Sequence, residues 1–199
     1  MRLGLMGGTF DPIHYGHLVA AEAARYEFGL GKVVFIPAGQ PPHKPAGEVT
    51  PAFHRVAMVR LGISTNPYFE ISTKEVDRPG PSYTVDTVAE FRRLYPSAAL
   101  YFITGADSVA EILTWYRFKD LLRLCLLVGV TRPGYSLGDL RERLAGLDEE
   151  LLQQIRVLPV PGVAVSSSEI RERVRAGKPI KYLLPEAVEE YITRQGLYL

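Results

Sequence analysis

Histidines and glycines gather between Met6 and His17, where the chain reads M-G-G-T-F-D-P-I-H-Y-G-H. Gly7 and Gly8 would let a large ligand approach the backbone and leave its amide N–H groups facing that ligand. His14 and His17 would project imidazole N–H donors into the same space, at a helix start that attracts anions. This combination of residues favours the binding of a phosphorylated ligand.

Other interpretations of this segment are less favoured. The glycines could simply make a turn with the histidines on the surface, but two histidines flank Gly16 directly after a buried strand. Zinc binding is a less favoured hypothesis, because no third metal ligand follows the two histidines at a usual spacing. Two familiar phosphate-binding loops are excluded: no G-x-G-x-x-G follows the first strand, and neither Gly31-Lys32 nor Gly177-Lys178 completes a P-loop.

Polar residues also follow three later strands. In G-A-D-S, Asp107 suits either the hydroxyls of a ribose or the cap of a helix. Arg132, in R-P-G-Y, suits either phosphate or the protein surface. In V-S-S-S-E-I-R, Ser166–Ser168 and Arg171 could meet a polyphosphate at a helix start, although S-S-S-E is also a capping-box pattern.

The elements that must position these residues are short apolar strands alternating with helical patterns. The alternation predicts an α/β fold, a doubly wound Rossmann-like parallel sheet with helices on both faces. Residues 1–199 would form a single domain, in which about 162–199 are a small C-terminal helical extension. The predicted strands are 2–6, 32–37, 68–72, 99–104, 125–131 and 156–160. The predicted helices are 16–28, 52–63, one from Ser82 or Thr84 to about 95, one after G-A-D-S, one or two within 137–155, 166–176 and 185–195.

Composition narrows the class of protein. The chain has 199 residues, of which 47% are hydrophobic and 23% charged, with a formal net charge of +1. This balance argues against a protein that coats nucleic acid. The apolar surroundings of Cys125 indicate a buried thiol, and no stretch is long enough to span a membrane. We expect a soluble protein of the cytoplasm.

The segment 37–51 is the longest predicted loop. It holds five prolines and two glycines, with regular structure resuming on both sides. We expect a mobile loop that brings Lys44 to a phosphate and becomes ordered when nucleotide binds.

Two of these stretches together carry a resemblance to a known family. G-G-T-F-D-P-I-H-Y-G-H and V-S-S-S-E-I-R resemble the paired signature of nucleotidyltransferases with a His-x-Gly-His motif. The resemblance is closer still to bacterial nicotinate mononucleotide adenylyltransferases and spans nearly the whole chain. Ser168 stands where that family usually has Thr, and both supply a hydroxyl. Further stretches follow in the family's order: P-P-H-K (41–44), P-S-Y-T-V-D-T (81–87), G-A-D (105–107), T-W-Y (114–116) and R-P-G-Y (132–135).

The resemblance implies an enzyme that joins nicotinate mononucleotide to ATP and releases deamido-NAD and pyrophosphate. It implies Mg²⁺ bound mainly by ATP phosphates and water, with no protein ligand named. The catalytic residues it implies are His14, His17, Lys44 and Arg171. The ATP-binding residues are Gly7, Gly8, Thr9, Phe10, Gly105, Asp107, Ser166, Ser167, Ser168 and Ile170. The residues for the mononucleotide are Tyr83, Thr84, Trp115 and Arg132.

Several alternatives stay open. The acceptor could be nicotinamide mononucleotide or another phosphate, such as phosphopantetheine or flavin mononucleotide. Adenylyltransferases for the last two usually lack the first histidine or the T-W-Y and S-Y-T stretches. A non-catalytic nucleotide sensor is disfavoured by the intact histidines, Lys44 and Arg171. Trp115 suits stacking on a pyridine ring and core packing equally well.

Overall fold

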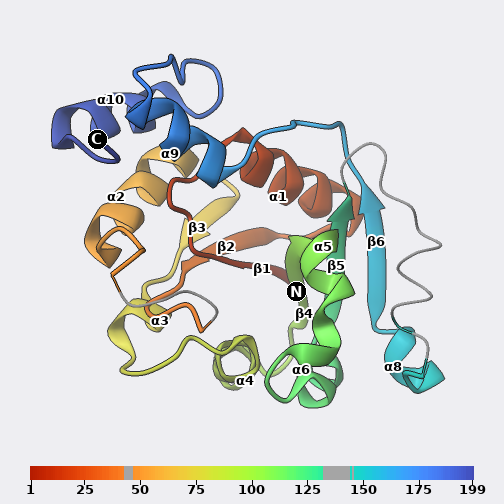
Figure 1. The fold of residues 1–199 in the computed structure, drawn as a ribbon. Coiled ribbons are helices and arrows are strands. Elements are labelled where there is room, and N and C mark those ends of the chain that lie inside the picture. The colour runs from red at the N-terminus through yellow and green to blue at the C-terminus, as the bar shows by residue number, and fades with distance from the viewer. Residues whose placement is uncertain (43–46, 132–143, 145) are drawn as a thin grey trace.

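The sheet at the centre of the molecule is parallel throughout. The structure, a computed structural model, describes residues 1–42, 47–131, 144 and 146–199. Its six strands lie in the order β3-β2-β1-β4-β5-β6 (Figure 1). This is the strand order of a doubly wound Rossmann sheet, with the reversal between β1 and β4. The strands are β1 (Arg2–Gly8), β2 (Lys32–Pro37), β3 (Phe69–Ile71), β4 (Ala99–Gly105), β5 (Leu126–Thr131) and β6 (Ile155–Pro159).

Helices cover both faces of this sheet, as predicted (Figure 1). Those before β4 are α1 (Tyr15–Glu27), α2 (Ala52–Ile63), α3 (Lys74–Asp77) and α4 (Thr84–Leu94). Those after β4 are α5 (Ala106–Ala110), the 3₁₀ turn η1 (Ile112–Thr114), α6 (Phe118–Leu124), α8 (Glu149–Leu152), α9 (Ser167–Arg175) and α10 (Glu186–Gln195).

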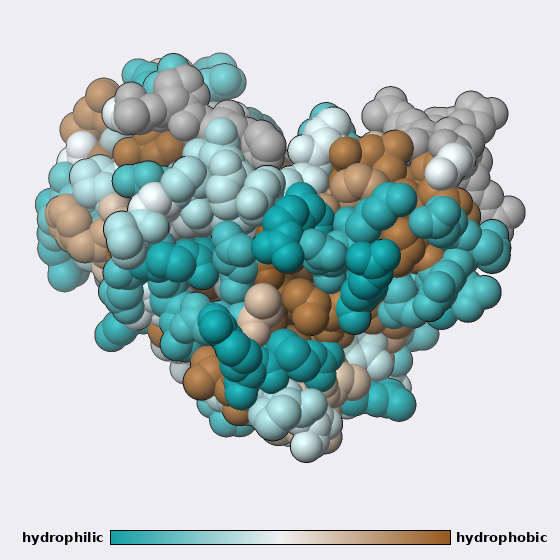
Figure 2. All heavy atoms as spheres, turned by 90° about the horizontal axis from the view of Figure 1, so that it is seen from below, coloured by the Kyte–Doolittle hydropathy of each residue, from teal (hydrophilic) through white to brown (hydrophobic). Residues whose placement is uncertain are grey.

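The side chains of β1 alternate between two cores. Leu3 and Leu5 belong to a cluster with Val88 of α4 and Leu121 of α6, whereas Met6 belongs to a cluster on the other face. That second cluster includes residues of α1, α2, α9 and α10. The outer surface of the α4 and α6 layer is mostly hydrophilic (Figure 2), as expected for helices whose apolar sides face the sheet. A sheet buried on both faces leaves its strand ends as the places for polar chemistry.

Helix ends agree with the sequence prediction in some places and not in others. Gly29 adopts a left-handed φ of +59° just after α1, as expected for a residue that stops a helix. The prediction that Ser82 or Thr84 caps α4 was wrong, because the N-cap is Tyr83 and makes no side-chain cap. The helix predicted after G-A-D-S is three short pieces, α5, η1 and α6, and the short helix α3 was not predicted.

Two of the sequence predictions fall partly outside the described residues. Most of the predicted helical region 137–155 lies outside them, and its described part contains α8. Residues 43–46 of the predicted mobile loop also lie outside them.

Candidate active site

Two cavities meet at the carboxyl ends of β1 and β4. We call the first pocket A, about 550 Å³, and the second pocket B, about 620 Å³. Both are lined by Gly7, Gly8, Thr104 and Ser108, so the end of β1 separates them and belongs to both. Ligands of doubly wound sheets bind at this position, where the strand order reverses.

Packing against phenylalanine rings disfavours a side chain at both shared positions of β1. A Cβ built on Gly7 would lie 2.8 Å from Cζ of Phe102, and one on Gly8 would lie 3.0 Å from the ring of Phe10. The rings of Phe102 and Phe10 therefore occupy the space that side chains at Gly7 and Gly8 would need. Phe10 itself is 2% exposed and lines neither pocket, and its role in ATP binding stays a prediction.

His14 and His17 lie together on pocket A, at the start of α1. Their rings stack with centroids 3.8 Å apart, and the backbone N–H of His14 donates to Nδ1 of His17 at 3.2 Å. Because Nδ1 of His17 accepts a hydrogen bond, the neutral ring carries its proton on Nε2. His17 is thereby prepared as an Nε2–H donor.

Gly16 explains the spacing of the two histidines. A Cβ at this position would lie 3.0 Å from Cε1 and from Nδ1 of His14. A side chain at this position would therefore crowd the ring of His14 and shift it from its place in the stack.

The start of α9 forms another wall of pocket A. Ser166, Ser167 and Ser168 all line it. Ser166 is the N-cap of α9, and its Oγ accepts from the N–H of Glu169 at 3.2 Å, so the capping interpretation is confirmed. Ser167 Oγ donates to the carbonyl of Pro12 at 2.8 Å. The serines therefore join α9 to the segment between β1 and α1.

The structure does not bring every predicted residue to pocket A. Gly105 lines the pocket, whereas Asp107 is exposed in the first turn of α5 beside it. Ile170 is fully buried in the core. Arg171 is half-buried, and its Nη1 donates to the carbonyl of Asp11 at 2.8 Å. Lys44 and Arg132 lie outside the described residues.

Aromatic side chains line one part of pocket B. Tyr83, Thr84 and Trp115 line it, as expected for the second substrate, together with Tyr116. The ring of Trp115 meets Phe102 edge-on at 6.3 Å, and those of Tyr83 and Tyr116 lie 4.4 Å apart. Trp115 therefore contacts the core with its ring and also lines the pocket. Its position is compatible with both roles considered from the sequence, core packing and stacking on a pyridine ring.

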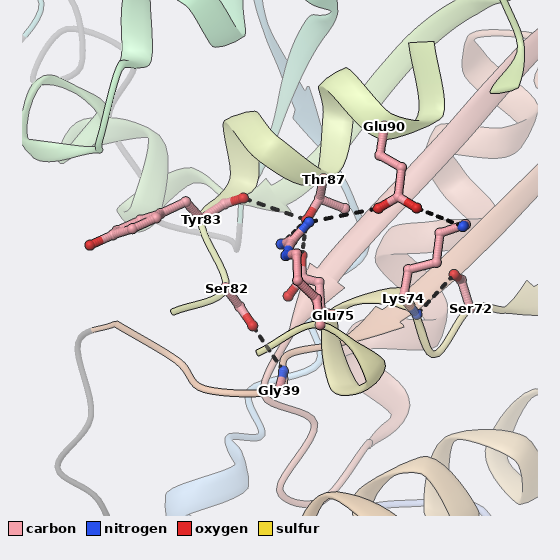
Figure 3. A network of polar contacts seen from close by, with 9 residues as sticks. Gly39, Ser72, Lys74, Glu75, Ser82, Tyr83, Thr87 and Glu90 are labelled. Carbon is pink, nitrogen blue, oxygen red and sulfur yellow. Dashed lines mark hydrogen bonds and ion pairs between the residues drawn. The ribbon is translucent and has the colours of Figure 1, made fainter. Parts of the chain in front are cut away.

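Ser82 joins two walls of pocket B (Figure 3). Its Oγ accepts from the N–H groups of Gly39 at 2.9 Å and Gln40 at 3.2 Å, and its own N–H donates to the carbonyl of Gln40. These bonds fasten the start of α4 to the segment that follows β2. Ser82 does not cap α4 because its hydroxyl is used here.

A buried carboxylate, Glu75, also lines pocket B (Figure 3). Thr87 Oγ1 donates to its Oε1 at 2.6 Å and accepts from Arg78 Nη2 at 3.0 Å. Burial raises the pKa of Glu75, while the Thr87 hydrogen bond and the positive charge of Arg78 act in the opposite direction. Pocket B therefore contains an acid whose charged form is disfavoured by its surroundings.

The described part of the chain contains neither a cluster of metal ligands nor a membrane-spanning helix. Within residues 1–42, 47–131, 144 and 146–199, no group of three or more His, Cys, Asp or Glu side chains is arranged to hold a metal ion. In the same part of the chain, no helix is long and apolar enough to cross a membrane.

Sequence reasoning missed several residues around the two pockets. Asp11 lies inside the first motif, but no spacing marked it, and its partners are distant along the chain. Glu75 carried no signal because a single acid in a short polar stretch usually lies on the surface. Ser108 follows the quoted G-A-D directly, and the placement of that loop could have identified it.

Comparisons with known proteins agree with this geometry. The cytidylyltransferase-like family model matches residues 5–173. The chain is 59% identical to the probable nicotinate-nucleotide adenylyltransferase of Moorella thermoacetica, covering 99% of this chain and 91% of that protein. It is 54% identical to the protein of the same name from Thermoanaerobacter sp., covering 100% and 94%.

A solved structure shares the fold at low sequence identity. The nicotinic acid mononucleotide adenylyltransferase of Plasmodium falciparum, complexed with NaAD, superposes with a TM-score of 0.75 at 20% identity, covering 99% of this chain and 97% of that one. The family model and the bacterial relatives extend over nearly the whole chain. The chain belongs to the cytidylyltransferase-like family and, within it, to the nicotinate-nucleotide adenylyltransferases.

Proposed function

We propose that this protein transfers the adenylyl group of ATP to nicotinate mononucleotide, which gives deamido-NAD and pyrophosphate. The observation that carries the proposal is the meeting of two unlike pockets at Gly7 and Gly8. One has paired histidines and a helix start, and the other has aromatic side chains. The names of the bacterial relatives support the same reaction.

The reaction is an in-line displacement at the α-phosphorus. An oxygen of the acceptor's 5′-phosphate forms the new P–O bond, the α–β bond breaks, and pyrophosphate leaves with its electron pair. The attacking oxygen is already anionic, so the protein must position two polyanions and stabilise charge rather than remove a proton.

Pocket A is assigned to ATP. His17 would donate from Nε2–H to the α-phosphate, because Nδ1 of His17 is already used as an acceptor. His14 would lie beside it. The start of α9 would receive the β- and γ-phosphates, with Arg171 near them. Asp107 would reach the adenosine ribose from the start of α5, and Lys44 would contribute a further positive charge.

Pocket B is assigned to nicotinate mononucleotide. Trp115 would stack on the pyridine ring, while Tyr83 and Thr84 at the start of α4 would contact its carboxylate. Arg132 would bind phosphate. The reacting phosphate would then lie against Gly7 and Gly8, where both pockets meet.

Magnesium is proposed to enter with ATP. Because the described residues offer no carboxylate cage, the site fits an ion held by phosphates and water rather than by protein ligands. When bound, Mg²⁺ would neutralise phosphate charge.

The direct test is pyrophosphate release from ATP and Mg²⁺ with four acceptors: nicotinate mononucleotide, nicotinamide mononucleotide, phosphopantetheine and flavin mononucleotide. We expect the fastest release with nicotinate mononucleotide and a product with the mass of deamido-NAD. Faster turnover of another acceptor would overturn the substrate assignment. ATP binding without turnover of any acceptor would indicate a nucleotide sensor.

A further inference from the structure

Asp11 is a buried acid inside the first motif that the proposed chemistry does not use. Asp11 is only 2% exposed to solvent. Tyr198 Oη donates to Oδ1 at 2.7 Å, and the backbone N–H of Thr50 donates to Oδ2 at 3.2 Å. Each carboxylate oxygen therefore accepts a hydrogen bond from a different distant segment. A carboxylate suits this position because both of its oxygens are acceptors.

Arg55 of α2 compensates the charge of this carboxylate. It is 1% exposed, and burial lowers the pKa of its guanidinium while the charge of Asp11 acts in the opposite direction. Its Nε donates to the carbonyl of Thr50 at 2.8 Å and its Nη1 to that of Thr9 at 2.9 Å. Arg55 therefore joins the Thr50 segment, which Asp11 also contacts, to Thr9 in the segment of Asp11 itself, and the buried cluster contains both charges and hydrogen bonds.

The backbone of Asp11 connects this cluster to pocket A. Its carbonyl accepts from Nη1 of Arg171 at 2.8 Å, and the next carbonyl, of Pro12, accepts from Ser167. His14 follows three residues later and lines pocket A. A shift of Asp11 would therefore move the acceptor that holds Arg171 and the segment that leads to the histidines.

A second phenol in the same region offers a comparison. Tyr191 of α10 hydrogen-bonds Nδ1 of His54 of α2 at 2.9 Å. It is half-buried like Tyr198, but its partner is not in the segment between β1 and α1. A hydrogen bond that served only to stabilise the fold would have similar consequences at both tyrosines.

We propose that Tyr198 and Asp11 are positioning residues for ATP, which fix Arg171 and the histidine segment in the geometry that receives the triphosphate. Without the Tyr198 hydroxyl, the Asp11 carboxylate still interacts with the N–H of Thr50 and the guanidinium of Arg55. We expect Asp11 to shift toward these two groups and away from its position in the wild type. This inference rests on the proposed function and adds residues that touch neither substrate.

The test compares Tyr198→Phe with Tyr191→Phe in steady-state kinetics and in calorimetric binding of a non-hydrolysable ATP analogue. Each variant loses the hydroxyl group of one tyrosine and the contacts that this hydroxyl makes. For Tyr198→Phe we expect the KM for ATP and the Kd of the analogue to rise about five- to tenfold, less than the full worth of a hydrogen bond to a charged group because the lost bond acts on ATP only through Asp11. We expect the KM for nicotinate mononucleotide to stay within about twofold, and Tyr191→Phe to change neither constant by more than about twofold.

Equal kinetic effects in the two variants, or a lower Tm in Tyr198→Phe without any change for ATP, would overturn the inference. Failure of the wild-type protein to turn over nicotinate mononucleotide would instead overturn the proposed function, and the binding arm would still report on Tyr198.

A double-mutant cycle gives an independent readout. Asp11→Asn should weaken ATP binding at least as much as Tyr198→Phe, because it removes the negative charge near the buried guanidinium of Arg55 as well as changing the hydrogen bond with Tyr198. If the two side chains act as one unit, the double variant is no weaker in ATP binding than Asp11→Asn alone. Additive effects would show that the two side chains act separately and would contradict the proposal.

Discussion

Pockets A and B use different parts of the chain to build their walls. Pocket A is made from bare backbone, hydroxyls and two imidazoles at the starts of helices. Pocket B includes the aromatic rings of Tyr83, Phe102, Trp115 and Tyr116, and its charged lining residues within the described part of the chain are the acids Glu75 and Glu111. A triphosphate needs N–H donors that approach it closely, whereas a pyridine ring needs flat surfaces.

The hydrogen bonds around the two pockets also attach to different segments of the chain. Around pocket A, Arg171, Ser167 and Tyr198 all bond to Asp11 or Pro12. Around pocket B, Ser82 binds the backbone after β2. Changes near one pocket should therefore alter one substrate's constants more than the other's, unless they reach the shared backbone of Gly7 and Gly8.

The largest effect is expected at His17. Removing a donor to the α-phosphate should lower kcat by about 10²–10³ in His17→Ala, the cost of losing one oxyanion donor. His54→Ala is the matched control, because His54 lines neither pocket. Steady-state kinetics at saturating substrates measures the change. A His17→Ala enzyme with more than half of the wild-type kcat would remove His17 from the mechanism.

A smaller loss is expected from Gly16→Ala. The new Cβ would lie 3.0 Å from the ring of His14 and shift it in its stack on His17, and we expect kcat/KM for ATP to fall about tenfold, about 1.4 kcal/mol of activation free energy. In the control Gly31→Ala, the nearest atom to the new Cβ is 3.7 Å away, and activity should not change. Equal activity in the two variants would mean that the stacked arrangement is unimportant.

Substrate choice tests pocket B alone. Hydroxyl and N–H donors at the start of α4 satisfy a carboxylate, whereas an amide NH₂ leaves such donors unpaired at about 1–3 kcal/mol each. We therefore expect kcat/KM for nicotinate mononucleotide to exceed that for nicotinamide mononucleotide by at least about tenfold, with the KM for ATP unchanged. Equal values for the two acceptors would contradict this assignment of Tyr83 and Thr84.

The smallest effect concerns Glu75 and pH. Its pKa is raised in the folded protein, so between the ordinary value of 4.5 and the raised value the folded state binds more protons than the unfolded state. The free energy of unfolding of the wild type should therefore rise, relative to that of Glu75→Gln, as pH falls through this window. Denaturant unfolding of both proteins across the window measures it, and a constant difference would show that Glu75 does not titrate there.

The sheet and most of its helices could be predicted because the signals are local. The apolar runs at 32–37 and 125–131 mark strands buried on both faces, and Gly29 marks the end of α1. Pocket A could be anticipated for the same reason, since its histidines, glycines and serines lie in two short motifs.

What could not be predicted depends on contacts between distant residues. Tyr198 and Asp11 are 187 residues apart, and neither carries a sign of the other. Ser82 was expected to cap a helix, but its hydroxyl binds the backbone at Gly39, 43 residues away. The helix expected after G-A-D-S is interrupted where Trp115 and Tyr116 turn to line pocket B.

The fluorescence of Trp115 tests the division between the two pockets most directly, because it is the only tryptophan in the chain and lines pocket B. Titration with nicotinate mononucleotide should quench its emission through stacking, and His17→Ala should show the same quenching. ATP alone should leave the emission unchanged, because it occupies pocket A. Quenching by ATP equal to that by the mononucleotide, or no quenching by the mononucleotide, would contradict the assignment of the pockets.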